Sequence, residues 1–242
     1  MRLNGTKILV DPYLSNSVEE LECSDLKRQI KIPYKPEELV DIDWVLITHD
    51  HIDHCDPFTI PLLAKASPSS KFIGPESVRK LLIKWGVNSK RVFSAPSNYR
   101  SLENDIWLIA VPCAHPKLIT GEDGMPLVVG WMLRVQGKVI YIAGDTCLFD
   151  GLFDFLRNQE EIDIGILPVN EDNYFRRKRG IIGNMSIREA FGLAKEIGIK
   201  KVFPAHWDLF SVNSALREEI EAIYHGYKWP FELVWDLSEY GK

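Results

Sequence analysis

The sequence lacks long apolar runs and is poor in cysteine. No run approaches the roughly 20 residues that a membrane-spanning helix requires, so no membrane association is expected. The amino-terminal stretch MRLNGTKILVDPY has no signal-peptide core of suitable length. The four cysteines are widely spaced and form no CxxC pair. In a chain of this size they are expected to be reduced thiols, which predicts a cytoplasmic protein.

An excess of basic residues is also absent. Lys and Arg total 29 against 34 Asp and Glu, which gives a formal net charge of −5. This acidic balance disfavours an extended nucleic-acid surface, but a local basic patch leaves nucleic acid open as a partner. Hydrophobic residues make up 45% of the chain, which is enough to build a substantial core and excludes wholesale disorder.

Short β-rich runs alternate with helical patterns along the chain. The expected strands cover residues 7–10, 43–49, 71–74, 105–111, 127–135, 138–144, 163–169 and 201–206. Gln136-Gly137 predicts a hairpin turn between two of them. Helices are expected over 75–86 and 186–197, the second with a capping box formed by Ser186 and Glu189. No repeat or linker interrupts this α/β pattern, so we expect a single domain over residues 1–242.

Half of the six histidines lie in the segment THDHIDHCD, directly after the apolar run WVLI. His49 and His51 are two residues apart, so they point the same way on an extended segment. Asp53 and His54 follow where the chain can turn, and Pro57 marks the expected start of a helix. A lone histidine is more often packed or solvated than a ligand. Four ligand-type residues within six positions instead predict a site for a divalent metal ion.

Three further ligand-type residues follow expected strands: His115 after DIWLIAVPCA, Asp145 after KVIYIAG and His206 after KVFPA. Taken singly, they could be a turn residue, a helix N-cap and a core histidine. The carboxyl ends of strands are where α/β folds build their sites, so together they indicate one site. The sixth histidine, His225, has no such context and is expected to be an ordinary surface residue.

The order of these residues resembles the metallo-β-lactamase superfamily across nearly the whole chain. The segments DPYLSN (11–16), PVNEDNYFRRKRGIIGNMS (168–186) and PAHWDLF (204–210) more narrowly resemble the L-ascorbate-6-phosphate lactonase branch. The resemblance implies an αββα sandwich with a dinuclear site along one edge. Only ten residues precede Asp11, so either the first hairpin is shortened or the true start lies upstream.

The resemblance also implies a ligand set. One metal ion would be held by His49, His51 and His115, a second by Asp53, His54 and His206, and Asp145 would bridge the two. Asp11 would support the site by accepting a hydrogen bond from a liganding imidazole. Nitrogen and oxygen ligands suit Mn²⁺, Zn²⁺ or Fe²⁺, and the lactonase branch favours Mn²⁺.

Such a site implies hydrolysis by a hydroxide shared between two metal ions, with Asp53 as the catalytic residue that orients it. The leading hypothesis is a metal-dependent hydrolase that opens a lactone or related ester of a small phosphorylated sugar acid. A phosphodiesterase or ribonuclease with the same site is the first alternative, supported by the basic run RRKR (176–179). A non-catalytic metal-binding protein is a third reading. Assembly into a homo-oligomer stays open.

The loop NEDNYFRRKRGIIGN (170–184) is expected to bind the anionic part of the substrate. It runs from a strand end to the capped helix, whose first backbone N–H groups favour anions, and arginine forks match phosphate oxygens. Four consecutive basic side chains cannot all face one pocket, and most are expected to be solvated. On resemblance to the lactonase branch, the residues expected to bind substrate are Asn170, Tyr174, Arg176 and Asn184.

Overall fold

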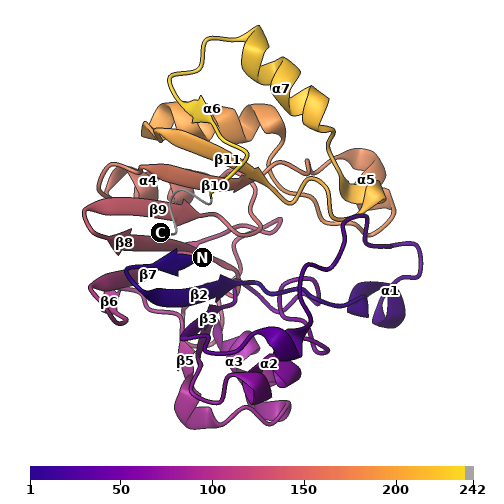
Figure 1. Ribbon diagram of the computed structural model, residues 1–242. Helices are drawn as coiled ribbons and strands as arrows, with labels where there is room; N and C mark the ends of the chain where they lie inside the picture. Colours follow the sequence, from indigo (N-terminus) through magenta and orange to yellow (C-terminus); the bar gives the residue numbers. More distant parts are fainter. Residues whose placement is uncertain (238–242) are drawn as a thin grey trace.

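Two β-sheets stacked face to face form the centre of the protein in the computed structural model, which describes residues 1–237 (Figure 1). The first sheet has five strands, of which only the β1–β2 pair is antiparallel. Its strand order is β1 (Arg2–Leu3), β2 (Thr6–Val10), β3 (Trp44–Leu46), β4 (Lys71–Gly74) and β5 (Val92–Ser94). With β1 only two residues long, the first hairpin is short.

The second sheet has seven strands, with β6 at one edge and β12 at the other. Along it, β6 to β9 pair antiparallel, whereas β9 to β12 pair parallel. Strands β7, β9, β10 and β11 therefore all run in one direction and end at the same edge. Its strands are β6 (Arg100–Ser101), β7 (Ile106–Pro112), β8 (Val129–Val135), β9 (Lys138–Ile142), β10 (Ile164–Pro168), β11 (Lys201–Ala205) and β12 (Glu232–Leu233).

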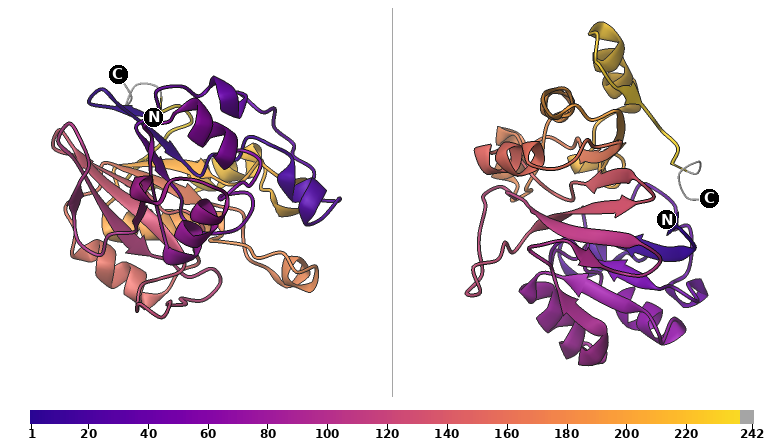
Figure 2. Two further views of the ribbon diagram at one scale, coloured as in Figure 1. Left: turned by 90° about the horizontal axis from the view of Figure 1, so that it is seen from below. Right: turned by 90° about the vertical axis from the view of Figure 1, so that its left-hand side faces the viewer.

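Helices cover the outer face of each sheet, which completes the αββα layering (Figures 1 and 2). On the first sheet these are α2 (Ile60–Ala66) and α3 (Glu76–Lys84); on the second they are α4 (Asp150–Arg157), α6 (Ile187–Ile197) and α7 (Arg217–Gly226). The shorter helical segments are α1 (Ser17–Leu21), α5 (Tyr174–Lys178), η1 (Pro36–Glu38), η2 (Ser89–Arg91) and η3 (Ser211–Asn213). No helix among residues 1–237 is long and apolar enough to cross a membrane.

The alternation of side chains along β8 shows why the layers form. Trp131 and Leu133 pack in the core between the two sheets, whereas Met132 packs against the helices on the other face. Successive strand residues point to opposite faces, so a strand with apolar side chains on both faces needs a covering layer on both sides. The second sheet is therefore buried on both faces, and the αββα architecture expected from the sequence is confirmed.

Two local predictions are also confirmed. Gln136 and Gly137 both have positive φ, 49° and 70°, as the tight turn between β8 and β9 requires. At the start of α6, the Ser186 hydroxyl accepts from the Glu189 backbone N–H, and the Glu189 carboxylate accepts from the Ser186 N–H. Gly198 ends the helix in the left-handed conformation, with φ 81°.

The largest differences from the predicted boundaries, three residues each, both lie beside the histidine segment. The strand expected over 43–49 ends at Leu46, because the Thr48 backbone N–H donates to the Asp11 carboxylate at 2.7 Å instead of to a neighbouring strand. The helix expected from Pro57 begins at Ile60, because the Asp56 carboxylate accepts from the Phe58 N–H at 2.9 Å and holds a turn there.

Asp56 also ties the amino-terminal segment to this turn. Its fully buried carboxylate accepts hydrogen bonds from the hydroxyls of Ser15 (2.7 Å) and Ser17 (2.8 Å), and from that of Thr59. The Thr59 hydroxyl in turn accepts from the Leu14 backbone N–H at 3.0 Å. This arrangement fixes the path of the residues that follow β2 against the turn that follows the histidine segment.

Asp56→Ala should lower the free energy of unfolding by about 2–4 kcal/mol, because it leaves buried hydroxyl and N–H donors without an acceptor. Urea denaturation followed by circular dichroism measures the change. The exposed Asp25, changed to Ala in the same way, is the matched control and should shift stability by less than about 0.5 kcal/mol. Equal effects of the two substitutions would show that Asp56 is not a structural hub.

Candidate metal centre

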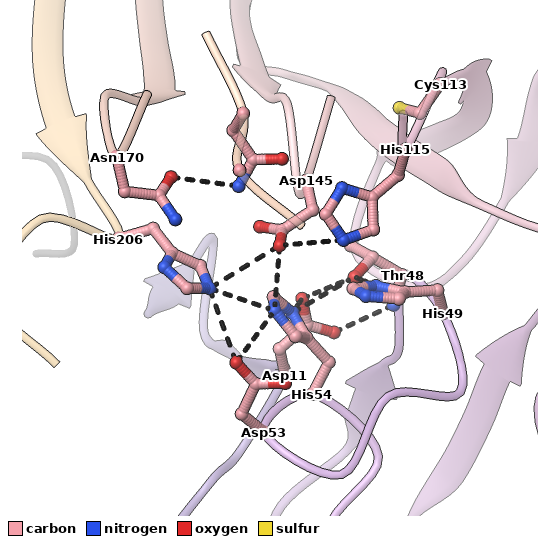
Figure 3. A network of polar contacts seen from close by, with 12 residues as sticks. Asp11, Thr48, His49, Asp53, His54, Cys113, His115, Asp145, Asn170 and His206 are labelled. Atoms are coloured by element: carbon pink, nitrogen blue, oxygen red, sulfur yellow. Dashed lines mark hydrogen bonds and ion pairs between the residues drawn. The ribbon is translucent and has the colours of Figure 1, made fainter. Parts of the chain in front are cut away.

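The ligand-type side chains converge at the edge where the strands of the second sheet end (Figure 3). His115 follows β7, Asp145 follows β9, and His206 directly follows β11. The loop after β3 of the first sheet brings the histidine segment to the same edge. The site is therefore built where both sheets meet, and the exposed His225 on α7 lies outside the group.

Two triads of side chains have ligand atoms that lie within 4.8 Å of one another. The first triad is His49, His51 and His115, and the second triad is Asp53, His54 and His206. These are the two groupings that the resemblance implied for the first and the second metal ion. A third group, His49, His54 and Asp145, overlaps both triads.

Asp145 lies between the triads. Its Oδ2 is 3.5 Å from the Nε2 of His115 in the first triad, and 3.6 Å and 3.5 Å from the Nε2 atoms of His54 and His206 in the second. One carboxylate oxygen is thus equidistant from imidazoles of both triads. This is the geometry that a bridging ligand would need.

The spacing of these atoms fits metal ligation better than hydrogen bonding. The Nε2 atoms of His54 and His206 are 3.3 Å apart, and the His206 Nε2 is 3.4 Å from the Asp53 Oδ2. Two ligands each about 2.1 Å from a tetrahedral ion are about 3.4 Å apart. In addition, the buried Nε2 of His49 has no hydrogen-bond partner among the described residues, as expected of an atom that faces an ion. The donor set therefore fits two divalent cations.

Asp11 and Thr48 orient the imidazoles of His49 and His54 through hydrogen bonds to their Nδ1 atoms. The Asp11 carboxylate can only accept, so the His54 Nδ1, 2.8 Å from its Oδ2, carries a proton and donates. The Thr48 hydroxyl donates to the same carboxylate at 2.6 Å, which leaves its oxygen to accept from the Nδ1 of His49 at 3.0 Å. Both imidazoles therefore carry a proton on Nδ1, and Nε2 is the ring nitrogen of each that is turned towards the centre.

Asp11 was expected from the sequence in this position, whereas Thr48 was missed. A hydroxyl residue directly before the histidine segment is the signal that could have indicated it, because a hydroxyl can donate and accept through the same oxygen. Backbone strain also marks the site: Asp11 and His206 are non-glycine residues with positive φ, 44° and 58°. Such conformations cost about 1–3 kcal/mol each and persist where surrounding contacts hold them.

The two triads differ in electrostatics, and the first triad favours neutral imidazoles. Burial lowers the pKa of His49 well below its usual value, and the neighbouring His54 lowers it further. Burial also lowers the pKa of His115, more than the carboxylate of Asp145 raises it. Uncharged imidazoles are the form that binds a metal ion. His49 and His115 of the first triad therefore favour the binding form near neutral pH.

The second triad is dominated by its carboxylates. Burial disfavours a charged imidazole at His54, but Asp145, Asp53 and Asp11 together raise its pKa well above the usual value. Asp145 and Asp53 raise the pKa of His206 in the same way against burial. Conversely, the two histidines hold the pKa of Asp53 and Asp145 low although both carboxyls are buried. The metal-free second triad thus contains carboxylates paired with protonated imidazoles.

Two of the residues expected to bind substrate, Arg176 and Tyr174, do not line the cavities at the metal centre. The Arg176 guanidinium donates to the backbone carbonyls of Asn170 (2.7 Å), Glu171 (2.6 Å) and Ser214 (2.7 Å), so it braces the loop. Tyr174 is 59% exposed on α5, which projects from the sandwich edge (Figures 1 and 2). Among the described residues that line the cavities beside the triads, neither Arg176 nor Tyr174 occurs.

Asn170 and Asn184 are brought together instead. Both are buried, and the Asn184 Nδ2 donates to the Asn170 Oδ1 at 2.9 Å. Asn170 lies beside His206 in Figure 3. This pair joins the end of β10 to the residues that precede α6. It closes the base of the 170–184 loop next to the metal centre.

Two cavities adjoin the centre. The first cavity, of about 750 Å³, reaches His51 and His115 of the first triad. Its lining includes Arg179, which sequence reasoning placed only in a solvated run, together with Glu22 and Asp25. The second cavity, of about 580 Å³, reaches His54 of the second triad. Asp53, Asp145 and His206 line both cavities.

Comparison with known proteins agrees with this geometry. The family model described as "Beta-lactamase superfamily domain" matches residues 6–207. A UPF0173 metal-dependent hydrolase of Pyrococcus abyssi is 26% identical over 90% of this chain and 84% of its own length. The probable L-ascorbate-6-phosphate lactonase UlaG of Salmonella heidelberg is also 26% identical over 85% of this chain, which spans 58% of that relative's length.

Among solved structures, Igni18, a metallo hydrolase from the archaeon Ignicoccus hospitalis, shares the fold. It superposes with a TM-score of 0.67 at 20% sequence identity, and the match covers 97% of this chain and 89% of that one.

We expect the purified protein to bind two divalent ions per chain, because two triads flank one bridging carboxylate. Elemental analysis after preparation without chelator measures the ratio. Asp145→Ala should lower the ratio towards one, since the triads then lose the ligand they share. His225→Ala, far from the centre, should keep two. A ceiling of one ion in the unchanged protein under metal-replete conditions would contradict the bridging role.

Metal binding at neutral pH should release protons from the second triad. The pKa values of His54 and His206 are raised above 6.5, and an imidazole must lose the proton from the coordinating nitrogen to bind metal. Apparent affinity should therefore rise with pH from below 6.5 until the raised pKa values are passed. Calorimetric titration with Zn²⁺ at pH 7, in buffers of different ionisation enthalpy, reports the protons released. An observed enthalpy that is the same in all buffers would rule out this linkage.

Proposed function

The chain belongs to the beta-lactamase superfamily, and from that membership we propose that it is a metal-dependent hydrolase with a dinuclear centre. The observation that carries the proposal is the Asp145 carboxylate oxygen, which is 3.5–3.6 Å from imidazoles of both triads. A merely structural metal site is closed by its protein ligands. This centre instead adjoins two cavities large enough for a small molecule.

The first triad would hold one ion and the second triad the other, with Asp145 between them. Two such ions supply Lewis-acid polarisation of the substrate and lower the pKa of coordinated water. The Asp53 carboxylate reaches both cavities and has a depressed pKa, so it is ionised and can orient water through a hydrogen bond. We also assign to it the transfer of the proton during turnover. Asp11 and Thr48 keep the imidazoles turned towards the centre.

The cysteine thiols with raised pKa values are poor candidates for the nucleophile. Burial raises the pKa of Cys147 to about 11, and it raises those of Cys55 and Cys113 further. Thiols with such pKa values are almost entirely protonated at neutral pH, and the thiolate is the reactive form.

All four cysteines are free, which supports the proposal that the protein acts in the reducing cytoplasm.

For the reaction, we favour opening of a lactone or related ester, with a phosphorylated sugar lactone as the first substrate to test and Mn²⁺ as the first metal. The fold alone does not distinguish between these substrates, but the sequence similarity to the lactonase relative supports a lactone. Arg179 on the first cavity is the cation that we assign to the anionic group, because the Arg176 guanidinium already donates to three carbonyls. A phosphodiester is the rival substrate, since α5 and its flank present exposed Arg177, Lys178 and Arg179.

The Mn²⁺-loaded protein should hydrolyse a phosphorylated sugar lactone with a higher kcat/KM than bis-p-nitrophenyl phosphate. Asp53→Asn should lower kcat by about 10²–10⁴, the usual contribution of general acid–base catalysis, and His225→Ala should not change it. Both rates are measured with substrate in excess after the metal content of each variant is checked. A preference for the diester would favour the phosphodiesterase alternative, and no turnover of either would favour a non-catalytic metal-binding protein.

Arg179→Ala should raise KM for the phosphorylated lactone by about 10- to 100-fold, equivalent to about 1.5–3 kcal/mol for a hydrogen bond to a charged group. An unphosphorylated analogue should be little affected. Arg176→Ala is the matched comparison: loss of its carbonyl contacts should lower the melting temperature and affect both substrates alike. Selective loss of the phosphorylated substrate in Arg176→Ala alone would reverse the two assignments.

A further inference from the structure

The second cavity has walls of a different chemistry from the first. It lies beside the gap between the sheets, with Val10 of β2 on one side and Ile142 of β9 and Ile166 of β10 on the other. The segment that leads to β3 covers it with Ile30 and Leu39. Val10, Ile142 and Ile166 belong to or pack against the apolar core between the two sheets. A substituent that enters this cavity would therefore exchange water for hydrocarbon.

Outside the metal centre, few polar side chains of this cavity could recognise a sugar. Arg28 is half-buried there, but its Nε donates to the Ser15 carbonyl at 3.3 Å and one Nη donates to the Tyr13 carbonyl. Its guanidinium also stacks on the Tyr13 ring, 4.2 Å from the ring centroid. Arg28 thus shapes the wall, and Tyr34 and Asp208 are the further polar side chains among the described lining residues that a sugar hydroxyl could contact.

The cavity is continuous with the reaction centre. It touches Asp53, His54 and His206 of the second triad as well as Asp145, and the first cavity touches three of these four from the other side. A scissile ester at the centre would therefore have an apolar space on one side and a polar space, with Arg179, on the other. The volume of about 580 Å³ lies within the range of small-molecule sites, about 300–1,000 Å³.

We propose that the second cavity binds an acyl or alkyl group of the substrate, so that the preferred substrates are amphiphilic lactones or esters. This inference rests on the proposed hydrolase function and extends it from sugar lactones to substrates with an apolar tail. Each buried methylene should improve binding by up to about fourfold, until the cavity is full. A dependence on chain length is thus the direct signature of the cavity.

The first test is binding and needs no turnover. Straight-chain carboxylates from butanoate to decanoate are titrated calorimetrically into the Mn²⁺-loaded protein. Affinity should rise about two- to fourfold per methylene over several carbons. Ile166→Trp, which fills the cavity, should flatten this rise. Ile30→Asp, at a 40% exposed position on the rim, should do the same without disturbing the core. Ile182→Trp, on the first cavity, is the matched control and should keep the rise.

The second test is hydrolysis of γ-lactones with alkyl substituents of increasing length. In the unchanged protein, kcat/KM should rise with length in parallel with carboxylate affinity, and Ile166→Trp should remove the rise. Carboxylate affinity that is independent of chain length, or a rise that survives in both cavity variants, overturns the apolar site. A length-dependent affinity in a protein that hydrolyses no lactone supports the site and instead overturns the proposed hydrolysis.

Discussion

The carboxylate of Asp11 is the group on which the metal centre depends. It stands at the end of β2 and accepts from the Thr48 N–H, the Thr48 hydroxyl and the His54 imidazole, all within 2.8 Å. The bond to the Thr48 N–H ends β3 just before the histidine segment. The bond to His54 fixes which of its ring nitrogens faces the metal centre. Asp56 acts in the same way one turn later, where it joins the segment after β2 to the start of α2. Two hydrogen-bonded carboxylates, Asp11 and Asp56, thus hold the histidine segment in place after the strand ends.

The centre combines two halves of opposite electrostatic character. Three imidazoles without a carboxylate of their own form one half, so burial dominates and keeps His49 and His115 neutral. In the other half, Asp53 and Asp145 outweigh burial and favour protonated His54 and His206. Bound cations would replace these protons without leaving either carboxylate unpaired. The same carboxylates that hold protons in the metal-free protein are therefore the ones that favour a divalent ion.

Much of this centre could be predicted from the sequence, because ligand-type residues at strand ends are brought to one edge by sheet topology alone. The positions of His115, Asp145 and His206 required only that β7, β9 and β11 run in one direction. The role of Arg176 could not be predicted, since four consecutive basic residues have no periodicity that shows which one faces inward. The second cavity was equally out of reach, because its walls come from segments far apart along the chain.

The sequence separation of the ligands has a consequence for how the protein matures. Residues of the first triad all lie within the first 115 positions, whereas His206, which lies 152 positions after His54, completes the second. Closing a loop of that length must precede any ion held between these two side chains. During synthesis on the ribosome, a chain that has emerged past β7 as far as His115 would already carry three imidazoles for one ion. A second ion would have to wait for His206 after β11, so its uptake would mark a finished fold.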